Sequence, residues 1–149
     1  MKTITPPLGL LEYLERVGSN AKLYAVRVAR DDLALELGCD ESHILQATLI
    51  LRSDLAPRLA VHSWTVAAEL TANERIASPM QTLLLTGYSP EWLPPFGHPH
   101  LIEASIDPRT LQMPCVWIPG GIPHSWMALD PQELVTLTDH SRWSRVFAA

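Results

Sequence analysis

The sequence of 149 residues lacks any apolar run approaching the roughly 20 residues that a membrane-spanning helix needs. Its longest apolar run is a few residues around Leu49–Leu51. Residues 1–7 contain no apolar stretch followed by a small-residue cleavage site, which argues against a signal peptide. The two cysteines, Cys39 and Cys115, are too few for a disulfide framework and lack the paired spacing of a zinc site. We therefore expect a cytoplasmic protein with no membrane partner.

Positive charge is also scarce, because 11 Lys and Arg residues stand against 16 Asp and Glu residues, for a net charge of −5. The basic residues are scattered along the chain without forming a stripe. This distribution argues against nucleic acid or an anionic membrane surface as the main partner. Since a local pocket can be positive when the whole protein is not, we expect an anionic small molecule as the ligand. The oligomeric state is left open.

The remaining composition, with 47% apolar and 18% charged residues, is that of a single folded domain spanning residues 1–149. Ten of the 13 prolines lie between Pro79 and Pro131. We expect no long helix in that stretch, because a proline inside a helix costs about 3 kcal/mol.

Apolar spacing and turn residues predict short helices and antiparallel hairpins. The predicted helices span residues 8–17, 31–37, 67–76 and 79–85. The predicted strands span residues 22–30, 44–52, 58–66, 115–118, 126–129 and 134–139. Two hairpins follow, one joining 44–52 to 58–66 and one joining 126–129 to 134–139. The fold class is therefore α+β, an antiparallel sheet of hairpins with short helices packed on one face.

Asp139 ends the last predicted strand. Alternate side chains of a strand face opposite sides, so Val135, Leu137 and Asp139 share one face. If that face is the core, desolvation raises the proton affinity of the carboxylate and suits it to general acid–base chemistry. The alternative is a strand-end carboxylate exposed to water.

The order of these elements resembles the chorismate pyruvate-lyases and the related effector-binding domain of GntR-type regulators. The segments that carry the resemblance are PPLGLLEYLERVG, KLYAVRVAR, LGCDESHILQATLIL, PRLAVHSWTV, SPMQTLLL and MALDPQELVTLTD. It implies a carbon–oxygen lyase that releases pyruvate from chorismate, or a related cyclohexadiene carboxylate, to leave a hydroxybenzoate without a cofactor. Leu137-Thr138-Asp139 takes the place of the family's Leu-Thr-Glu, so the resemblance implies that Asp139 is catalytic.

The resemblance also implies four substrate-binding residues: Gln46, Arg52, His62 and Met80. Gln46 is nearest to the position where the family has an arginine on its first long strand. Arg52 lies on the same face six residues further on, and His62 stands where the family has another basic residue. In the family's proline-led helix a glycine stands where this chain has Gln81, next to Met80. The missing arginine favours an alternative, a non-catalytic small-molecule or partner-binding module on the same fold.

A second alternative is a cupin-type metal enzyme, whose ligands are His98, His100, Glu103 and His124. Three imidazoles and one carboxylate suit Fe, Mn or Zn. Only 20 residues separate Glu103 from His124, with three prolines before Pro123, and a cupin needs several strands between its two motifs. Loop histidines beside a proline-glycine turn are therefore the simpler interpretation, with no bound metal.

The five tryptophans are dispersed and are predicted to form core and pocket walls. Trp92, Trp117 and Trp126 lie in the stretch that we expect to cover a ligand. The sequence leaves open whether residues 87–123 form a rigid wall or a lid.

Overall fold

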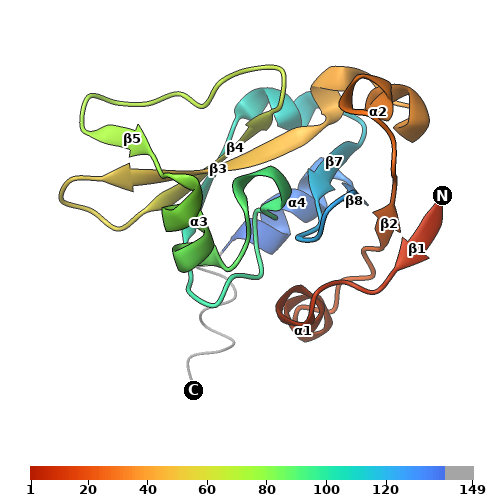
Figure 1. Cartoon of the computed structure of the whole chain (residues 1–149), viewed down its shortest axis with the longest axis horizontal. Helices are drawn as coiled ribbons and strands as arrows, with labels where there is room; N and C mark the ends of the chain where they lie inside the picture. Colours follow the sequence, from red (N-terminus) through yellow and green to blue (C-terminus); the bar gives the residue numbers. More distant parts are fainter. Residues whose placement is uncertain (140–149) are drawn as a thin grey trace.

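The computed structural model describes residues 1–139, which fold into two four-stranded sheets surrounded by helices (Figure 1). The helices are α1 (Leu8–Arg16), α2 (Arg30–Leu37), α3 (Pro79–Thr86) and α4 (Pro131–Thr138), with 3-10 turns η1 (Glu41–His43), η2 (Pro90–Trp92) and η3 (Pro108–Gln112). The strands are β1 (Lys2–Ile4), β2 (Leu23–Ala25), β3 (Leu45–Arg52), β4 (Arg58–Ser63), β5 (Glu74–Ile76), β6 (Glu103–Ile106), β7 (Val116–Pro119) and β8 (Ser125–Leu129). None of these helices is long and apolar enough to cross a membrane.

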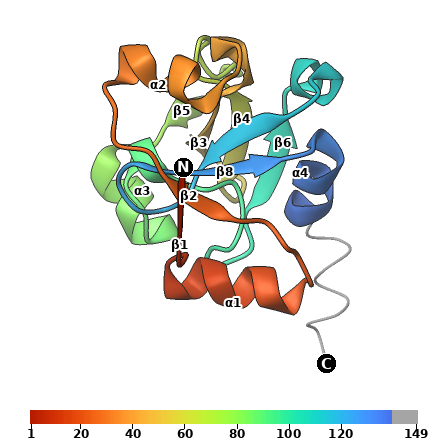
Figure 2. The same cartoon turned by 90° about the vertical axis from the view of Figure 1, so that its right-hand side faces the viewer.

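The first sheet has the order β1-β2-β8-β7 and is antiparallel throughout, and the second has the order β5-β3-β4-β6. In the second sheet β4 and β6 are parallel neighbours, while the other pairs are antiparallel. The predicted α+β class is confirmed. The helices lie around both sheets, as the quarter-turned view shows for α3 and α4 on opposite sides (Figure 2).

The hairpin of β3 and β4 confirms the clearest prediction from the sequence, with Leu45 opposite Ser63 and Ile50 opposite Arg58. The predicted helices at residues 8–17 and 79–85 are also confirmed as α1 and α3. The Ser78 hydroxyl and the Gln81 side chain form a capping box that starts α3, and a left-handed glycine follows its last turn. In these elements the apolar spacing and the turn or end residues all favour the same structure.

The predicted strand at residues 134–139 is wrong, because this segment belongs to α4. The Asp130 carboxylate accepts a hydrogen bond from the Gln132 N–H at 2.7 Å, and Pro131 takes the first helical position. Thr138 donates its hydroxyl back to the Leu134 carbonyl at 2.8 Å, which satisfies the side chain inside the helix. The β-branched residues of this segment had suggested a strand, but the capped start decides for a helix.

Two further boundaries differ from the prediction. The segment 22–30 forms a strand only at Leu23–Ala25, and α2 already begins at Arg30. The predicted helix at residues 67–76 is wrong, because Glu74–Ile76 pair with β3 as β5. Pairing with a neighbouring strand therefore overrides the local preference of this polar segment.

The two sheets share one core. Leu45 of β3 and Val61 of β4 pack in the same buried cluster as Ile118 of β7 and Met127 of β8. An isolated parallel bridge between Ile44 and Trp117 joins the start of β3 to β7. The start of β3 is thus fixed at the junction of the sheets.

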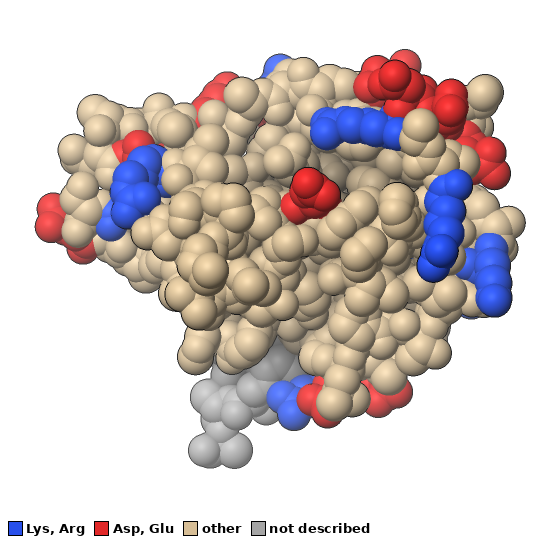
Figure 3. Space-filling view, in the orientation of Figure 1, with Lys and Arg blue, Asp and Glu red and all other residues tan. Residues whose placement is uncertain are grey.

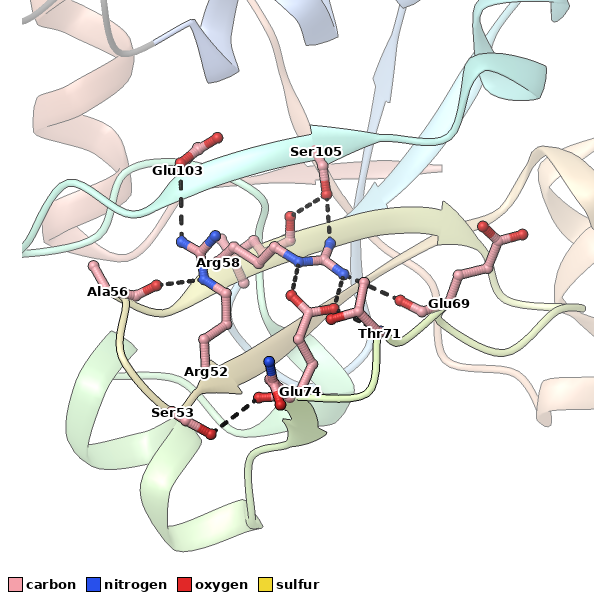
Figure 4. A network of polar contacts seen from close by, with 11 residues as sticks. Arg52, Ser53, Ala56, Arg58, Glu69, Thr71, Glu74, Glu103 and Ser105 are labelled. Carbon is pink, nitrogen blue, oxygen red and sulfur yellow. Dashed lines mark hydrogen bonds and ion pairs between the residues drawn. The ribbon is translucent and has the colours of Figure 1, made fainter.

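Arg58 ties the outer part of the second sheet together (Figure 4). Its guanidinium makes two charge-assisted hydrogen bonds to the Glu74 carboxylate, at 2.7 and 2.8 Å, and donates to the Ser105 hydroxyl at 2.8 Å and the Glu69 carbonyl at 3.1 Å. These hydrogen bonds from Arg58, together with the Thr71 backbone N–H, lower the pKa of Glu74 to about 2. The contacts hold the long segment between β4 and β5 against the sheet.

Candidate active site

A cleft of about 400 Å³ opens where the two sheets meet. Its walls come from five parts of the chain that are far apart in sequence. The lining residues are Val26, Val28, Arg30, Leu33, Leu45, Gln46, Trp64, Pro90, Glu91, Trp92, Pro119, His124 and Trp126. Leu45 and Gln46, at the start of β3, form one wall of the cleft. This wall is rigid because the start of β3 is buried at the junction of the sheets.

Aromatic rings form much of the cleft wall. Trp126 of β8 meets Trp64 edge-on with ring centroids 6.0 Å apart, and meets Trp92 of η2 at 5.7 Å. The His124 ring lies 5.4 Å from Trp92. The Arg30 guanidinium at the start of α2 lies over the Trp64 ring, 4.5 Å from its centroid. The cleft therefore offers flat apolar surfaces with a cation at its edge.

Three backbone hydrogen bonds hold the turn between β7 and β8. The Val26 N–H donates to the His124 carbonyl at 2.8 Å, and the Gly120 N–H donates to the Ser125 carbonyl at 3.0 Å. The Gly121 N–H donates to the Trp92 carbonyl at 2.8 Å, which links this turn to η2. His124 itself has a positive φ of 60°, a sparsely populated backbone conformation for a residue with a side chain. This turn fixes the imidazole beside Trp92.

The cleft also presents polar groups that protein contacts leave available. The Trp64 Nε1–H is buried and has no hydrogen-bond acceptor within residues 1–139. Buried donors in folded proteins almost always have an acceptor, so this N–H is an exception among the described residues. Gln46 is half-buried, while Arg30, Glu91 and His124 are exposed at the cleft. Such a site suits a ligand with a flat ring, oxygen acceptors and a charged group.

The sequence matches the profile of the aminoacyl-tRNA editing domain over residues 26–137. This match covers most of the chain and all of the cleft. The chain belongs to the aminoacyl-tRNA editing domain family. No curated protein matches its sequence at a significant level.

Three solved structures agree with the editing domain fold. One is described as a candidate trans-editing enzyme for prolyl-tRNA synthetase; it is 24% identical, with a TM-score of 0.80 over 90% of this chain and 94% of that one. A scaffold protein from computational epitope grafting is 22% identical, with a TM-score of 0.79 over 87% and 89% of the two chains. A hypothetical protein is 23% identical, with a TM-score of 0.75 over 87% and 93%. At these identities the likeness establishes the fold alone.

Membership of the editing family corrects the functional predictions. The resemblance to chorismate pyruvate-lyases was wrong, and with it the lyase activity on chorismate. The cupin-type alternative is also wrong, and no group of three or more metal-binding side chains occurs within residues 1–139. An editing domain acts on charged tRNA, so the expectation that nucleic acid is not a partner was wrong as well.

Asp139 lies away from the cleft. It follows the last turn of α4 and its side chain is exposed, so it is not a buried strand residue. Nearby, the Tyr13 hydroxyl donates to the Leu137 carbonyl at 2.5 Å. Burial raises the pKa of Tyr13 to about 12, and the negative charge of Asp139 adds to the effect. The acid–base role predicted for Asp139 depended on a strand and a core face that the structure does not have.

The four predicted substrate-binding residues are dispersed. Only Gln46 lines the cleft. Arg52 lies at the far end of β3, where its Nε donates to the Ala56 carbonyl at 2.7 Å (Figure 4). Met80 is 63% exposed on α3.

His62, the fourth of these residues, is buried in β4 with both ring nitrogens engaged. Its Nδ1 lies 2.9 Å from the Ser63 carbonyl and its Nε2 lies 2.9 Å from the Thr48 hydroxyl. Since a carbonyl only accepts, Nδ1 donates to Ser63, and Nε2 shares a hydrogen bond with the Thr48 hydroxyl. His62 therefore serves the packing of the hairpin.

The four residues of the metal alternative are also separated. The His98 ring bonds the Pro94 carbonyl at 2.7 Å, and His100 is exposed in the following loop. Glu103 lies on β6 with its carboxylate 4.0 Å from Arg52. His124 alone reaches the cleft.

Sequence reasoning missed Arg30, Trp64 and Glu91 as cleft residues. It had placed Trp92 and Trp126 in a stretch expected to cover a ligand, and both line the cleft, whereas Trp117 packs in the neighbouring core. A signal for Trp64 was its position just after a buried strand, at the edge where β4 leaves the sheet. Nothing local marks Arg30 or Glu91, because their role depends on elements distant in sequence.

Proposed function

We propose that this editing domain hydrolyses the ester bond between an amino acid and the 3′ end of tRNA, removing amino acids that a synthetase has attached wrongly. The observation that carries the proposal is that every cleft residue lies between Val26 and Trp126, inside the segment that matches the editing family. One structural neighbour is described as a candidate trans-editing enzyme for prolyl-tRNA synthetase, so tRNA for proline is the first substrate to test. Since tRNA is charged in the cytoplasm, the proposal places the protein there.

A set of four exposed cations supports contact with the tRNA backbone: Lys2, Lys22, Arg27 and Arg30. Antiparallel pairing of β1 with β2 places Lys2 opposite Ala25, two residues before Arg27. Figure 3 shows basic side chains on this side of the molecule. The first turn of α2 is acidic beyond Arg30, which confines the basic surface to the β1–β2 side of the cleft. Because Arg30 also lines the cleft, the surface leads phosphates towards it.

The cleft holds the groups that ester hydrolysis needs. The attacking water must lose a proton, and the carbonyl oxygen must be stabilised as it becomes negative. In the proposed reaction the His124 imidazole takes a proton from the water as the water oxygen bonds to the carbonyl carbon. The imidazole then returns this proton to the 3′ oxygen of the tRNA as the ester bond breaks. The Gln46 amide donates to the carbonyl oxygen.

The experiment is a deacylation assay with purified protein and tRNA that carries a radiolabelled amino acid. Label remaining on the tRNA is followed over time, first for proline tRNA charged with non-cognate amino acids and then for other mischarged tRNAs. We expect release of at least one amino acid well above the rate without protein. A protein preparation with His124→Ala, made in parallel, excludes a contaminating esterase. If no charged tRNA loses its amino acid faster with the protein than without it, the proposal is overturned.

A further inference from the structure

Glu91 gives the cleft a single negative charge. It lies in the η2 turn, and it is the one acidic side chain among the lining residues that the structure describes. Its carboxylate makes no hydrogen bond or ion pair with any residue in the range 1–139. The charge is therefore available to a ligand.

The surroundings of Glu91 suit a cation. The ring of Trp92, the next residue, meets that of Trp126 edge-on with centroids 5.7 Å apart, and Trp126 meets Trp64 edge-on at 6.0 Å. Ring faces attract cations through their quadrupoles, as Arg30 already demonstrates over Trp64 at 4.5 Å. A carboxylate beside such rings provides the full charge, and the rings provide a wall that excludes water from one side of the ligand.

The backbone that carries Glu91 is attached to the β7–β8 turn. The Trp92 N–H donates to the Ser89 carbonyl at 3.2 Å within η2, and the Gly121 N–H donates to the Trp92 carbonyl at 2.8 Å. The second bond attaches η2 to the turn that carries His124. A group bound by Glu91 therefore lies on the part of the cleft wall that is attached to the His124 turn.

We propose that Glu91 binds the α-ammonium group of the aminoacyl ester and so restricts the enzyme to charged tRNAs whose amino acid has a free amino group. The inference rests on the proposed editing function and names its substrate class. In every such ester the ammonium is one carbon away from the carbonyl that water attacks, so holding the ammonium also positions the carbonyl. Acylation of the nitrogen, as in peptidyl-tRNA, removes the charge and adds bulk against Trp92.

The test compares wild-type protein with Glu91→Gln on one aminoacyl-tRNA and on its N-acetylated form. Loss of a charge-assisted hydrogen bond is expected to raise KM for the free-amino substrate about 10-fold to 100-fold. The wild-type protein should hydrolyse the N-acetylated form poorly, and Glu91→Gln should leave that rate unchanged. Glu133→Gln, which removes an exposed carboxylate from the first turn of α4, is the matched control and should behave as the wild type.

Binding of a non-hydrolysable analogue separates this inference from the proposed function. The probe is 3′-aminoacylamino-adenosine, in which an amide replaces the ester, and its binding is followed by the fluorescence of the cleft tryptophans. The wild-type protein should bind the free-amino analogue at least 10-fold more tightly than its N-acetyl form, and Glu91→Gln should remove that preference. Equal affinity of the wild-type protein for the two analogues would overturn the inference, whether or not the protein deacylates tRNA. So would a Glu91→Gln variant that weakens both analogues equally.

Discussion

Removing Arg27 should weaken the salt dependence of tRNA binding, because it reduces the proposed phosphate contacts from four to three. Arg27 is exposed, lies on the segment that follows β2, and does not line the cleft. It is one of the four cations, with Lys2, Lys22 and Arg30, that are proposed to contact phosphates. Arg27→Ala therefore tests tRNA contact without touching the proposed chemistry.

The expected magnitude follows from counterion release. Each phosphate contact contributes about 0.7 to 0.9 to the slope of log affinity against log salt concentration, so four contacts give a slope of about −3. The affinity for tRNA should then fall roughly 60-fold between 50 and 200 mM salt. With one contact fewer the slope becomes about −2.3, and the same change of salt lowers the affinity only about 25-fold.

Fluorescence anisotropy of labelled, uncharged tRNA over a series of salt concentrations measures both slopes. Arg75→Ala is the control, because Arg75 is also an exposed arginine but lies on β5, at the other end of the molecule in Figure 1. Its slope should equal that of the wild-type protein. An Arg27→Ala slope equal to the wild-type slope, or the same reduction for both variants, would refute the placement of tRNA on the β1–β2 side.

Three further predictions concern the cleft and the stability of the fold. His124→Ala should lower kcat for deacylation about 100-fold, whereas His100→Ala, outside the cleft, should leave it unchanged; equal rates for both would remove His124 from the chemistry. Trp64→Phe leaves a smaller ring in the cleft wall and under Arg30, so deacylation should fall about 10-fold, and an unchanged rate would mean that the Trp64 ring does not contact the substrate. Glu74 has a folded-state pKa of about 2, below its usual value of about 4.5, so its stabilising effect is present above pH 4.5 and lost as the pH falls towards 2. Urea unfolding between pH 5 and pH 2 should therefore show a shallower loss of stability for Glu74→Gln than for the wild-type protein, and parallel losses would contradict the ion pair with Arg58.

Local signals predicted the parts of the fold that local interactions decide. The β3–β4 hairpin and the helices α1 and α3 follow from short-range patterns of apolar and turn residues. For α4 the signal was present but was read as a turn. Asp130 followed by Pro131 is a helix start, and weighing this cap above the β-branched residues after it would have given the correct element.

The cleft could not be predicted in the same way, because its walls meet only after the two sheets have packed together. Gln46 and His124 were each chosen from the sequence for other chemistries, and nothing in the sequence indicated that they share a site. The basic surface shows the same effect. Lys2 is 25 residues from Arg27 in sequence, and strand pairing brings β1 beside β2, so a chain with scattered cations forms a local positive region.

Gly120 makes the β7–β8 turn intolerant of even one added methyl group. A Cβ at this position would clash with Leu23 Cδ1 and would lie 2.8 Å from the Ser125 hydroxyl oxygen. Because Leu23 belongs to the main core, the turn rather than the core has to yield, and it carries the imidazole with it. We therefore expect Gly120→Ala to remain folded, with the His124 imidazole displaced from the position that the proposed ester hydrolysis requires. The position of the His124 imidazole therefore depends on the missing Cβ of Gly120.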